Sequence, residues 1–114
     1  MTANDILKMG LALMGDSETN SLGYNSDEYA ARGLFAVNQI LGELCGIEAE
    51  SLQSEISVSP RVKTAAPWGV AMMLSLGEGD AVRNSVFADI YNPLRAMAKG
   101  ETAHITDVLP KSEV

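Results

Sequence analysis

Cys45 and His104 are the two side chains of this sequence best suited to nucleophilic catalysis or metal binding, and each is the only residue of its type. A thiol beside an imidazole forms a nucleophile, while structural zinc needs four thiolate or imidazole ligands. Two residues are too few for such a zinc site. Because a lone cysteine is most often a small buried hydrophobic residue, we predict that Cys45 packs near the buried side of a helix and does not react.

Acidic residues supply the other candidates for chemistry. Glu48 and Glu50, or Asp27 and Glu28, stand close enough in the sequence to act as an acid and a base. Neighbours on a helix do not face each other, however, and exposed carboxylates are commonly only solvated. Residues 16–27 have oxygen ligands at three early positions of a calcium loop, but a serine stands where the sharp turn needs glycine. We therefore predict no catalytic residue, no metal and no cofactor, and we expect that the chain is not an enzyme.

The composition indicates one helical domain without a nucleic-acid surface. The length of 114 residues is typical of one domain, and with only 5% aromatic residues the core must consist mainly of Leu, Ile, Val, Met and Ala. The formal charge is −7, and residues 1–57 account for it with two bases against nine acids. We expect an acidic side of the molecule and no sequence-specific binding of nucleic acid, which normally needs a basic patch. The first apolar stretch, residues 9–14, is too short for a signal-peptide core or a membrane span, so we expect no membrane association.

Apolar periodicity predicts helical stretches at residues 2–14, about 27–46, 67–77 and 81–100. Thr2 and Asp5 form the pattern of a capping box at the first of them. The second has the clearest apolar face, and Gly46 is placed to end it. That face consists of Ala30, Leu34, Val37, Leu41 and Leu44.

Two prolines mark the last two helical stretches. Pro67 lacks an amide hydrogen and suits a first turn, so we predict a helix that begins there, ends at Gly77 and, being apolar on nearly every side, forms the buried centre of the bundle. Asp80 then caps the last stretch, in which Pro93 should cause a kink or a break. The predicted core face of that stretch comprises Val82, Val86, Ile90, Leu94 and Met97, joined by Phe87.

These elements together predict an all-α fold: a small bundle of four to five helices with a long inter-helix connection and an extended C-terminal tail. Residues 1–100 form a single helical domain in this prediction, and residues 101–114 form the extended tail. The connection at residues 48–66 is open between an extended loop and a small strand.

The segment at residues 67–92, "PWGVAMMLSLGEGDAVRNSVFADIYN", carries the most specific pattern of the chain. It combines a Pro-aromatic-Gly helix start, a small apolar helix, a Gly/acid turn and a helix with an aromatic residue and Tyr-Asn. It follows "LALMG" and "YNSDEYAARGLFAVNQILGEL". With this order of parts the chain resembles, over nearly its whole length, the small head-to-tail connector (adaptor or head completion) proteins of long-tailed phages and prophages. Pro93 departs from the uninterrupted final helix expected in that family.

The resemblance implies a structural virion protein that is found in the host cytoplasm during assembly. Such a subunit forms a ring, dodecameric in the virion, beneath the portal protein. The ring extends the DNA channel and joins the tail through a tail completion or tail terminator protein.

A ring built head to tail needs two different, complementary patches on each subunit. The acidic first half of the chain and the basic residues of its second half fit that requirement. We predict that Arg61 and Lys63 lie in a loop. The candidate interface with a neighbouring subunit or the portal consists of Arg61, Lys63, Arg95, Lys99, Ile105, Val108 and Leu109. The alternative is a non-viral small helical module, regulatory or partner-binding, whose methionine-rich helix binds a partner helix in a groove.

Overall fold

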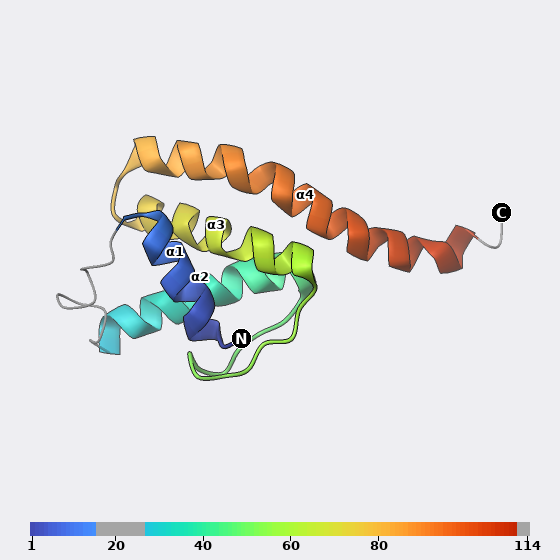
Figure 1. The fold of residues 1–114 in the computed structure, drawn as a ribbon, viewed down its shortest axis with the longest axis horizontal. Coiled ribbons are helices and arrows are strands. Elements are labelled where there is room, and N and C mark those ends of the chain that lie inside the picture. The colour runs from blue at the N-terminus through green and yellow to red at the C-terminus, as the bar shows by residue number, and fades with distance from the viewer. Residues whose placement is uncertain (16–26, 112–114) are drawn as a thin grey trace.

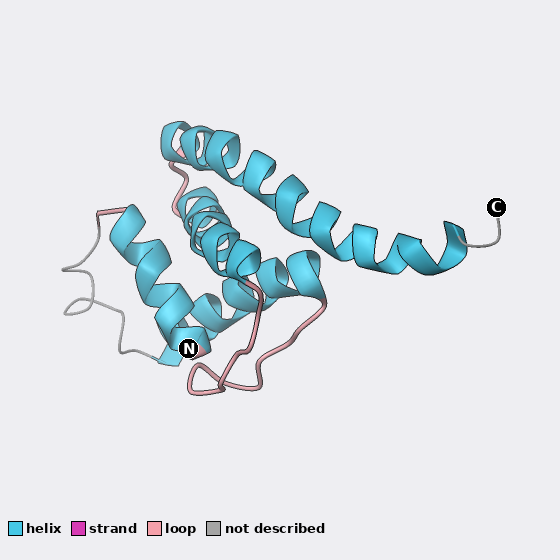
Figure 2. Ribbon diagram, turned by 45° about the vertical axis from the view of Figure 1, so that its right-hand side comes forward, coloured by secondary structure: helices cyan, strands magenta, loops and turns pink. Residues whose placement is uncertain are grey.

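The computed structural model describes the backbone of residues 1–15 and 27–111 and the side chains of residues 1–15 and 30–100. Within these residues the chain forms four α-helices: α1 (Ala3–Leu13), α2 (Asp27–Cys45), α3 (Pro60–Gly77) and α4 (Ala81–Lys111). Helix α3 packs against the other three, with α4 on one side of it and α1 and α2 on the other (Figures 1 and 2). The predicted all-α bundle with a long inter-helix connection is thus confirmed.

Helix α1 begins with the capping box that the sequence predicts. Thr2 Oγ1 accepts a hydrogen bond from the Asp5 N–H at 3.1 Å, and the Asp5 carboxylate accepts one from the Thr2 N–H at 2.8 Å. The hydrogen bond from the Thr2 backbone lowers the pKa of Asp5. Two polar residues therefore fix the start of α1, and its apolar residues, with Leu7 fully buried, remain available for the core.

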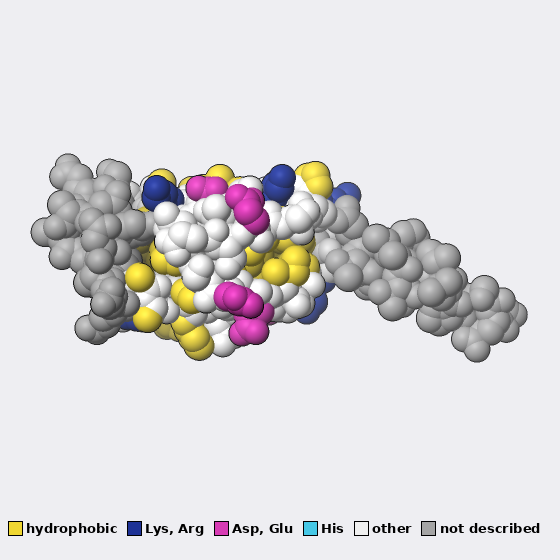
Figure 3. Space-filling model, turned by 90° about the horizontal axis from the view of Figure 1, so that it is seen from below, with side chains coloured by type: hydrophobic (Ala, Val, Ile, Leu, Met, Phe, Trp, Pro, Cys, Tyr) yellow, Lys and Arg dark blue, Asp and Glu magenta, His cyan; other side chains and the backbone are white. Residues whose placement is uncertain are grey.

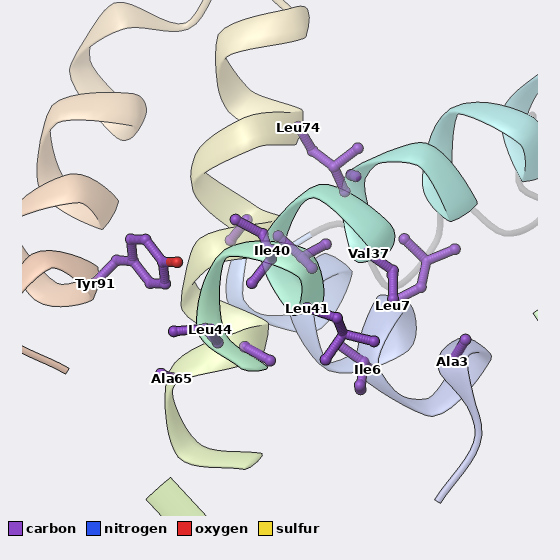
Figure 4. Packing of buried hydrophobic residues seen from close by; sticks show 14 of the residues in the cluster. Ala3, Ile6, Leu7, Val37, Ile40, Leu41, Leu44, Ala65, Leu74 and Tyr91 are labelled. Atoms are coloured by element: carbon purple, nitrogen blue, oxygen red, sulfur yellow. The ribbon is translucent and has the colours of Figure 1, made fainter. Parts of the chain in front are cut away.

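Helix α2 supplies the centre of the core, as its periodicity predicts. Val37, Ile40, Leu41 and Leu44 are all buried and point toward α1, α3 and α4 (Figure 4). Gly46 follows the helix with a φ of 74°, a conformation that favours glycine and ends the helix where the sequence places its end.

Helix α3 begins at Pro60 and not, as predicted, at Pro67. Ser59 caps it, because its Oγ accepts a hydrogen bond from a first-turn N–H at 3.4 Å and Pro60 takes the first helical position. Both prolines suit a first turn, and the capping serine decides between them. Arg61 and Lys63 therefore lie in the first turn of α3, and the prediction that they lie in a loop is wrong.

Small residues allow α3 to occupy the centre of the bundle. A Cβ atom at Gly69 would lie 2.7 Å from the ring of Tyr91 in α4 and 2.8 Å from Ile40 of α2, so only glycine fits between these helices. Similarly, a Cβ atom at Gly10 of α1 would lie 2.8 Å from the side chain of Val70 in α3. Trp68 is half-buried at the rim of α3 and its ring lies 6.1 Å from that of Phe87 in α4. The central position predicted for this apolar helix is confirmed.

Helix α4 faces the bundle with only part of the predicted set of residues. Val82, Val86 and Met97, expected in the core, are exposed. Phe87 and Leu94 lie on the face against α3 as predicted, and Tyr91 and Ala98, which the prediction does not include, complete that face. Two apolar stripes run along this helix, and the stripe with the two large aromatic rings is buried because it removes more apolar area from water.

Pro93 does not break α4, which continues to Lys111 as one helix. The proline removes one hydrogen bond to the carbonyl of Asp89, and both residues are exposed, so water can satisfy that carbonyl. Residues 101–111, predicted as an extended tail, are helical and project beyond the other three helices (Figure 1). Asp80 caps the start of α4 as predicted, since its carboxylate accepts the Arg83 N–H at 3.0 Å.

The connection between α2 and α3 is a loop that is held to α2 near its start and to the N-terminal segment near its end. Asn38 of α2 bonds the backbone of Ala49 twice, at 2.7 and 2.9 Å. The loop pairs with the N-terminal segment through one isolated antiparallel bridge, between Thr2 and Glu55. Ile56 is buried beneath this pairing. Of the two alternatives for residues 48–66, the structure therefore shows an extended loop that ends at α3, with a single bridge in place of a strand.

Candidate functional site

The residues first considered for chemistry do not come together in the described part of the chain. No group of three or more His, Cys, Asp or Glu side chains is placed to hold a metal among the described residues. Cys45 is half-buried and its Sγ donates a hydrogen bond to the Leu41 carbonyl at 3.4 Å. Burial raises the pKa of this thiol, which disfavours the reactive thiolate. The side chain of His104 and the calcium-like residues 16–26 lie outside what the structure describes.

The most exposed large apolar side chains of α4 form one line, which we call the outer stripe and define as Val82, Val86, Ile90, Pro93 and Met97. Val82 is 76% exposed, and Val86 and Met97 are each 51% exposed. Ile90 is half-buried at the edge of the bundle. Three- and four-residue spacings keep these residues on one side of the helix, away from the ring of Tyr91. The outer stripe is therefore an apolar surface that α1, α2 and α3 do not cover.

A second apolar surface lies on the outer side of α2, where Phe35 is 60% exposed between two hollows. One hollow, of about 370 Å³, is bounded by Ala31 and Arg32 of α2 and by Met73 and Gly77 at the end of α3. We call the two hollows with Phe35 between them the α2 groove.

The other hollow, of about 550 Å³, continues along α2 past Asn38 and Gly42 to Glu48. Ala31 and Gly42 lie on the same side of α2 as Phe35, four residues before it and seven after it. Their small size leaves space beside the ring, and nothing lies within 4 Å of the position that a Cβ of Gly42 would take. The apolar pattern of α2 pointed to the inner face and missed Phe35. The alternation of a small, a large and a small residue at helical spacing is the signal that identifies this outer surface.

The predicted basic interface is divided between two places. Arg61 lies beside α4, where its Nη1 donates to the Met97 carbonyl at 3.3 Å next to a hollow of about 170 Å³. Lys63 is exposed in the same turn of α3, and Lys99 is exposed on α4. Arg61 thus adjoins the Met97 end of the outer stripe. The side chains of Ile105, Val108 and Leu109 lie outside those described, and their backbone belongs to α4.

Arg95, the remaining predicted interface residue, is engaged within its own chain. Its Nη1 lies 3.2 Å from a carboxylate oxygen of Glu43 on α2. The Tyr91 hydroxyl donates to the other oxygen of that carboxylate at 2.6 Å. Burial raises the pKa of Tyr91, and the hydrogen bond to Glu43 raises it further, so the hydroxyl stays a donor at neutral pH. Arg95 and Glu43 therefore join α4 to α2 before any partner binds.

Both signs of charge and exposed apolar atoms occur together on the surface. Figure 3 shows the side at the bottom of Figure 1, where hydrophobic side chains are visible between small groups of acidic ones. In the described part of the chain, no helix is sufficiently long and apolar to cross a membrane. The face seen in Figure 3 is suited to contact with other protein chains, because interfaces combine an apolar centre with a polar rim.

The outer stripe with the adjoining Arg61 and the separate α2 groove are thus the two candidate sites, and each has the geometry of a binding surface. No known protein family, no curated protein and no solved structure matches this chain.

Proposed function

We propose that this chain is a head-to-tail connector subunit, a structural virion protein that forms a ring beneath the portal, extends the DNA channel and joins the tail. The observation that carries the proposal is the presence of two separate apolar surfaces, the outer stripe and the α2 groove, on one small helical chain. Extended apolar surface on a soluble protein usually marks contacts with other chains. A subunit inside a ring needs such a surface on each of two sides.

The shape of the molecule supports the same function. Its principal extents are 57 × 30 × 18 Å, and the end of α4 extends the long axis beyond the bundle (Figure 1). Residues 101–111 add roughly 16 Å of helix at about 1.5 Å per residue. Such a projection provides a connector with an element that reaches a protein above or below its ring, the portal on one side or the tail completion or terminator protein on the other.

The test measures assembly. The full-length chain, alone and co-expressed with the portal protein of the same genome, is analysed by sedimentation velocity and by electron microscopy. We expect closed rings that bind the portal coaxially. A chain that stays monomeric at every concentration and does not bind the portal would contradict the proposal.

A double variant, Arg61→Glu with Lys63→Glu, sharpens this test. Both residues lie in the first turn of α3, where positive charge opposes the helix dipole, so the reversal favours the isolated helix. Arg61 also donates to the Met97 carbonyl of its own chain, so circular dichroism must show that the variant is as helical as the parent. With the helix content unchanged, a loss of rings or of portal binding reports a lost contact and not a lost fold. Lys8→Glu, a reversal of one positive charge at an exposed position of α1, is the control for each of the two reversals. Unchanged assembly of the double variant would remove this patch from the interface.

The alternative function, a partner-binding helical module, is favoured by one observation: the hollow between Phe35 and Met73 is open and mainly apolar. A module of that kind stays monomeric and binds a single helix in the groove. The same sedimentation experiment separates the two functions, because a stable monomer in the presence of portal is expected only for the module.

A further inference from the structure

We propose that the outer stripe of one copy packs lengthwise, in parallel direction, along the α2 groove of the next copy. This contact deepens the proposed function and rests on it, because it names the surfaces through which neighbouring ring subunits meet. The occupant of the groove is therefore a second copy of this chain.

The two surfaces complement each other in shape and polarity. The outer stripe is a convex row of side chains on a helix, with Val86 and Met97 exposed. The α2 groove offers hollows on either side of Phe35, with small residues at Ala31 and Gly42. Side chains of one helix that enter gaps between side chains of another give the usual packing of two helices.

The charges beside the two surfaces also match, and they fix the direction of the contact. Asp89 is exposed at the edge of the outer stripe, and its side chain has no ion-pair partner among the described residues. Arg61 lies at the Met97 end of the same stripe. The α2 groove has the opposite order, with Arg32 in its first half and Glu48 at its far end.

A parallel alignment places Asp89 near Arg32 and Arg61 near Glu48, so that both pairs are of opposite sign. An antiparallel alignment places like charges together, which costs binding free energy at an interface. The charge of Arg83, at the start of α4, is offset by the carboxylate of Asp80 in the same chain.

The outer stripe and the α2 groove lie on different sides of the subunit, so the same contact can repeat along a series of copies. Figures 1 and 2 show α4 on one side of α3 and the first half of α2 on the other. One copy therefore presents its outer stripe to one neighbour and its α2 groove to another. A contact between two different patches gives a ring when the rotation closes.

The experiment uses two variants of the full chain, Val86→Glu on the outer stripe and Phe35→Glu in the α2 groove, with Met9→Glu as control. Met9 is an exposed apolar residue of α1 that belongs to neither surface. We expect each of the two variants to weaken self-association at least about tenfold in sedimentation velocity, since each buries an unpaired charge. Met9→Glu should assemble like the parent. Circular dichroism verifies that each variant is helical, and Phe35→Ala replaces Phe35→Glu if the charge unfolds the chain.

Mixing the two variants is the decisive step. Val86→Glu keeps an intact groove and Phe35→Glu keeps an intact stripe, so the mixture should form one-to-one pairs that do not grow. Rings that persist in either variant, or a mixture that contains only monomers, would overturn the contact. A parent chain that stays monomeric and is destabilised by Phe35→Glu would also overturn the contact, because the groove would then be filled from within the same chain. Rings that persist in both variants refute only this contact, whereas a parent chain that neither assembles nor binds portal refutes the connector function as well.

Discussion

The two apolar stripes of α4 differ in what they contact, although the sequence pattern of both is helical. The inner stripe, with Phe87 and Tyr91, packs on α3, whereas the outer stripe, with Val82 and Val86, is exposed. This difference shows that periodicity identifies the apolar faces of a helix but does not predict which of them is buried. The helix is buried on the side where the larger aromatic area meets the small residues of α3, and the remaining side becomes a surface for other chains.

Truncation of one residue in each stripe should give the largest difference in the free energy of unfolding between two variants. Phe87→Ala removes a ring that is 7% exposed and packs on Trp68, so the free energy of unfolding should fall by about 3 kcal/mol. Val86→Ala, one position away, should change it by less than about 0.5 kcal/mol. Urea unfolding of dilute, monomeric protein measures both. Equal losses in the two variants would mean that the outer stripe is part of the core.

Replacement of Pro93 should stabilise the chain. Pro93→Ala restores the amide that can bond the Asp89 carbonyl and removes the clash of the ring inside α4. Because an interior proline costs up to about 3 kcal/mol relative to alanine, we expect a gain of 1 to roughly 3 kcal/mol and more helix by circular dichroism. Pro67→Ala is the control, since Pro67 is buried and its loss also leaves a void. Destabilisation by Pro93→Ala would contradict a continuous α4.

The smallest effect is expected from the polar contact at the inner stripe. Tyr91→Phe removes the hydrogen bond to Glu43 and should cost about 1 kcal/mol at neutral pH. Burial raises the pKa of Tyr91 above its ordinary value of 10.0, so the neutral hydroxyl contributes stability that is full below pH 10 and is lost as the pH rises further. The parent should therefore lose stability above pH 10 more steeply than Tyr91→Phe in alkaline urea titrations. Identical alkaline slopes would mean that Tyr91 is not buried against Glu43.

Local signals in the sequence predicted most of the helices and their ends. Thr2 and Asp5, Gly46 and Asp80 act through bonds or backbone angles of their immediate neighbours, so their effect is visible in a few residues. The start of α3 was misplaced because Pro67 and Pro60 carry the same signal. The serine before Pro60 distinguishes them.

The candidate site was only partly predictable. The basic residues could be named from charge, but nothing in the sequence shows that Arg95 pairs with Glu43, 52 positions away, or that Arg61 reaches Met97. Phe35 was missed because its exposure depends on which face of α2 meets α1 and α3. The connector function, its ring and its partners remain proposals, supported by the two apolar surfaces and by the resemblance of the sequence pattern.

The sequence by itself determined the helical class, the caps of α1 and α4 and the inner face of α2, because these depend on spacings and contacts within a few residues. The tertiary structure alone decided which stripe of α4 is buried and which apolar side chains remain exposed for partners. It also decided that Pro93, and the Asp89 carbonyl that it leaves without a hydrogen bond, lie in an exposed part of α4. The physical reason is that apolar burial has no direction of its own and depends on area. A stripe is buried only where another element fits against it. The ring of Tyr91 fits against α3 because Gly69 has no side chain, whereas a Cβ atom at that position would lie 2.7 Å from the ring.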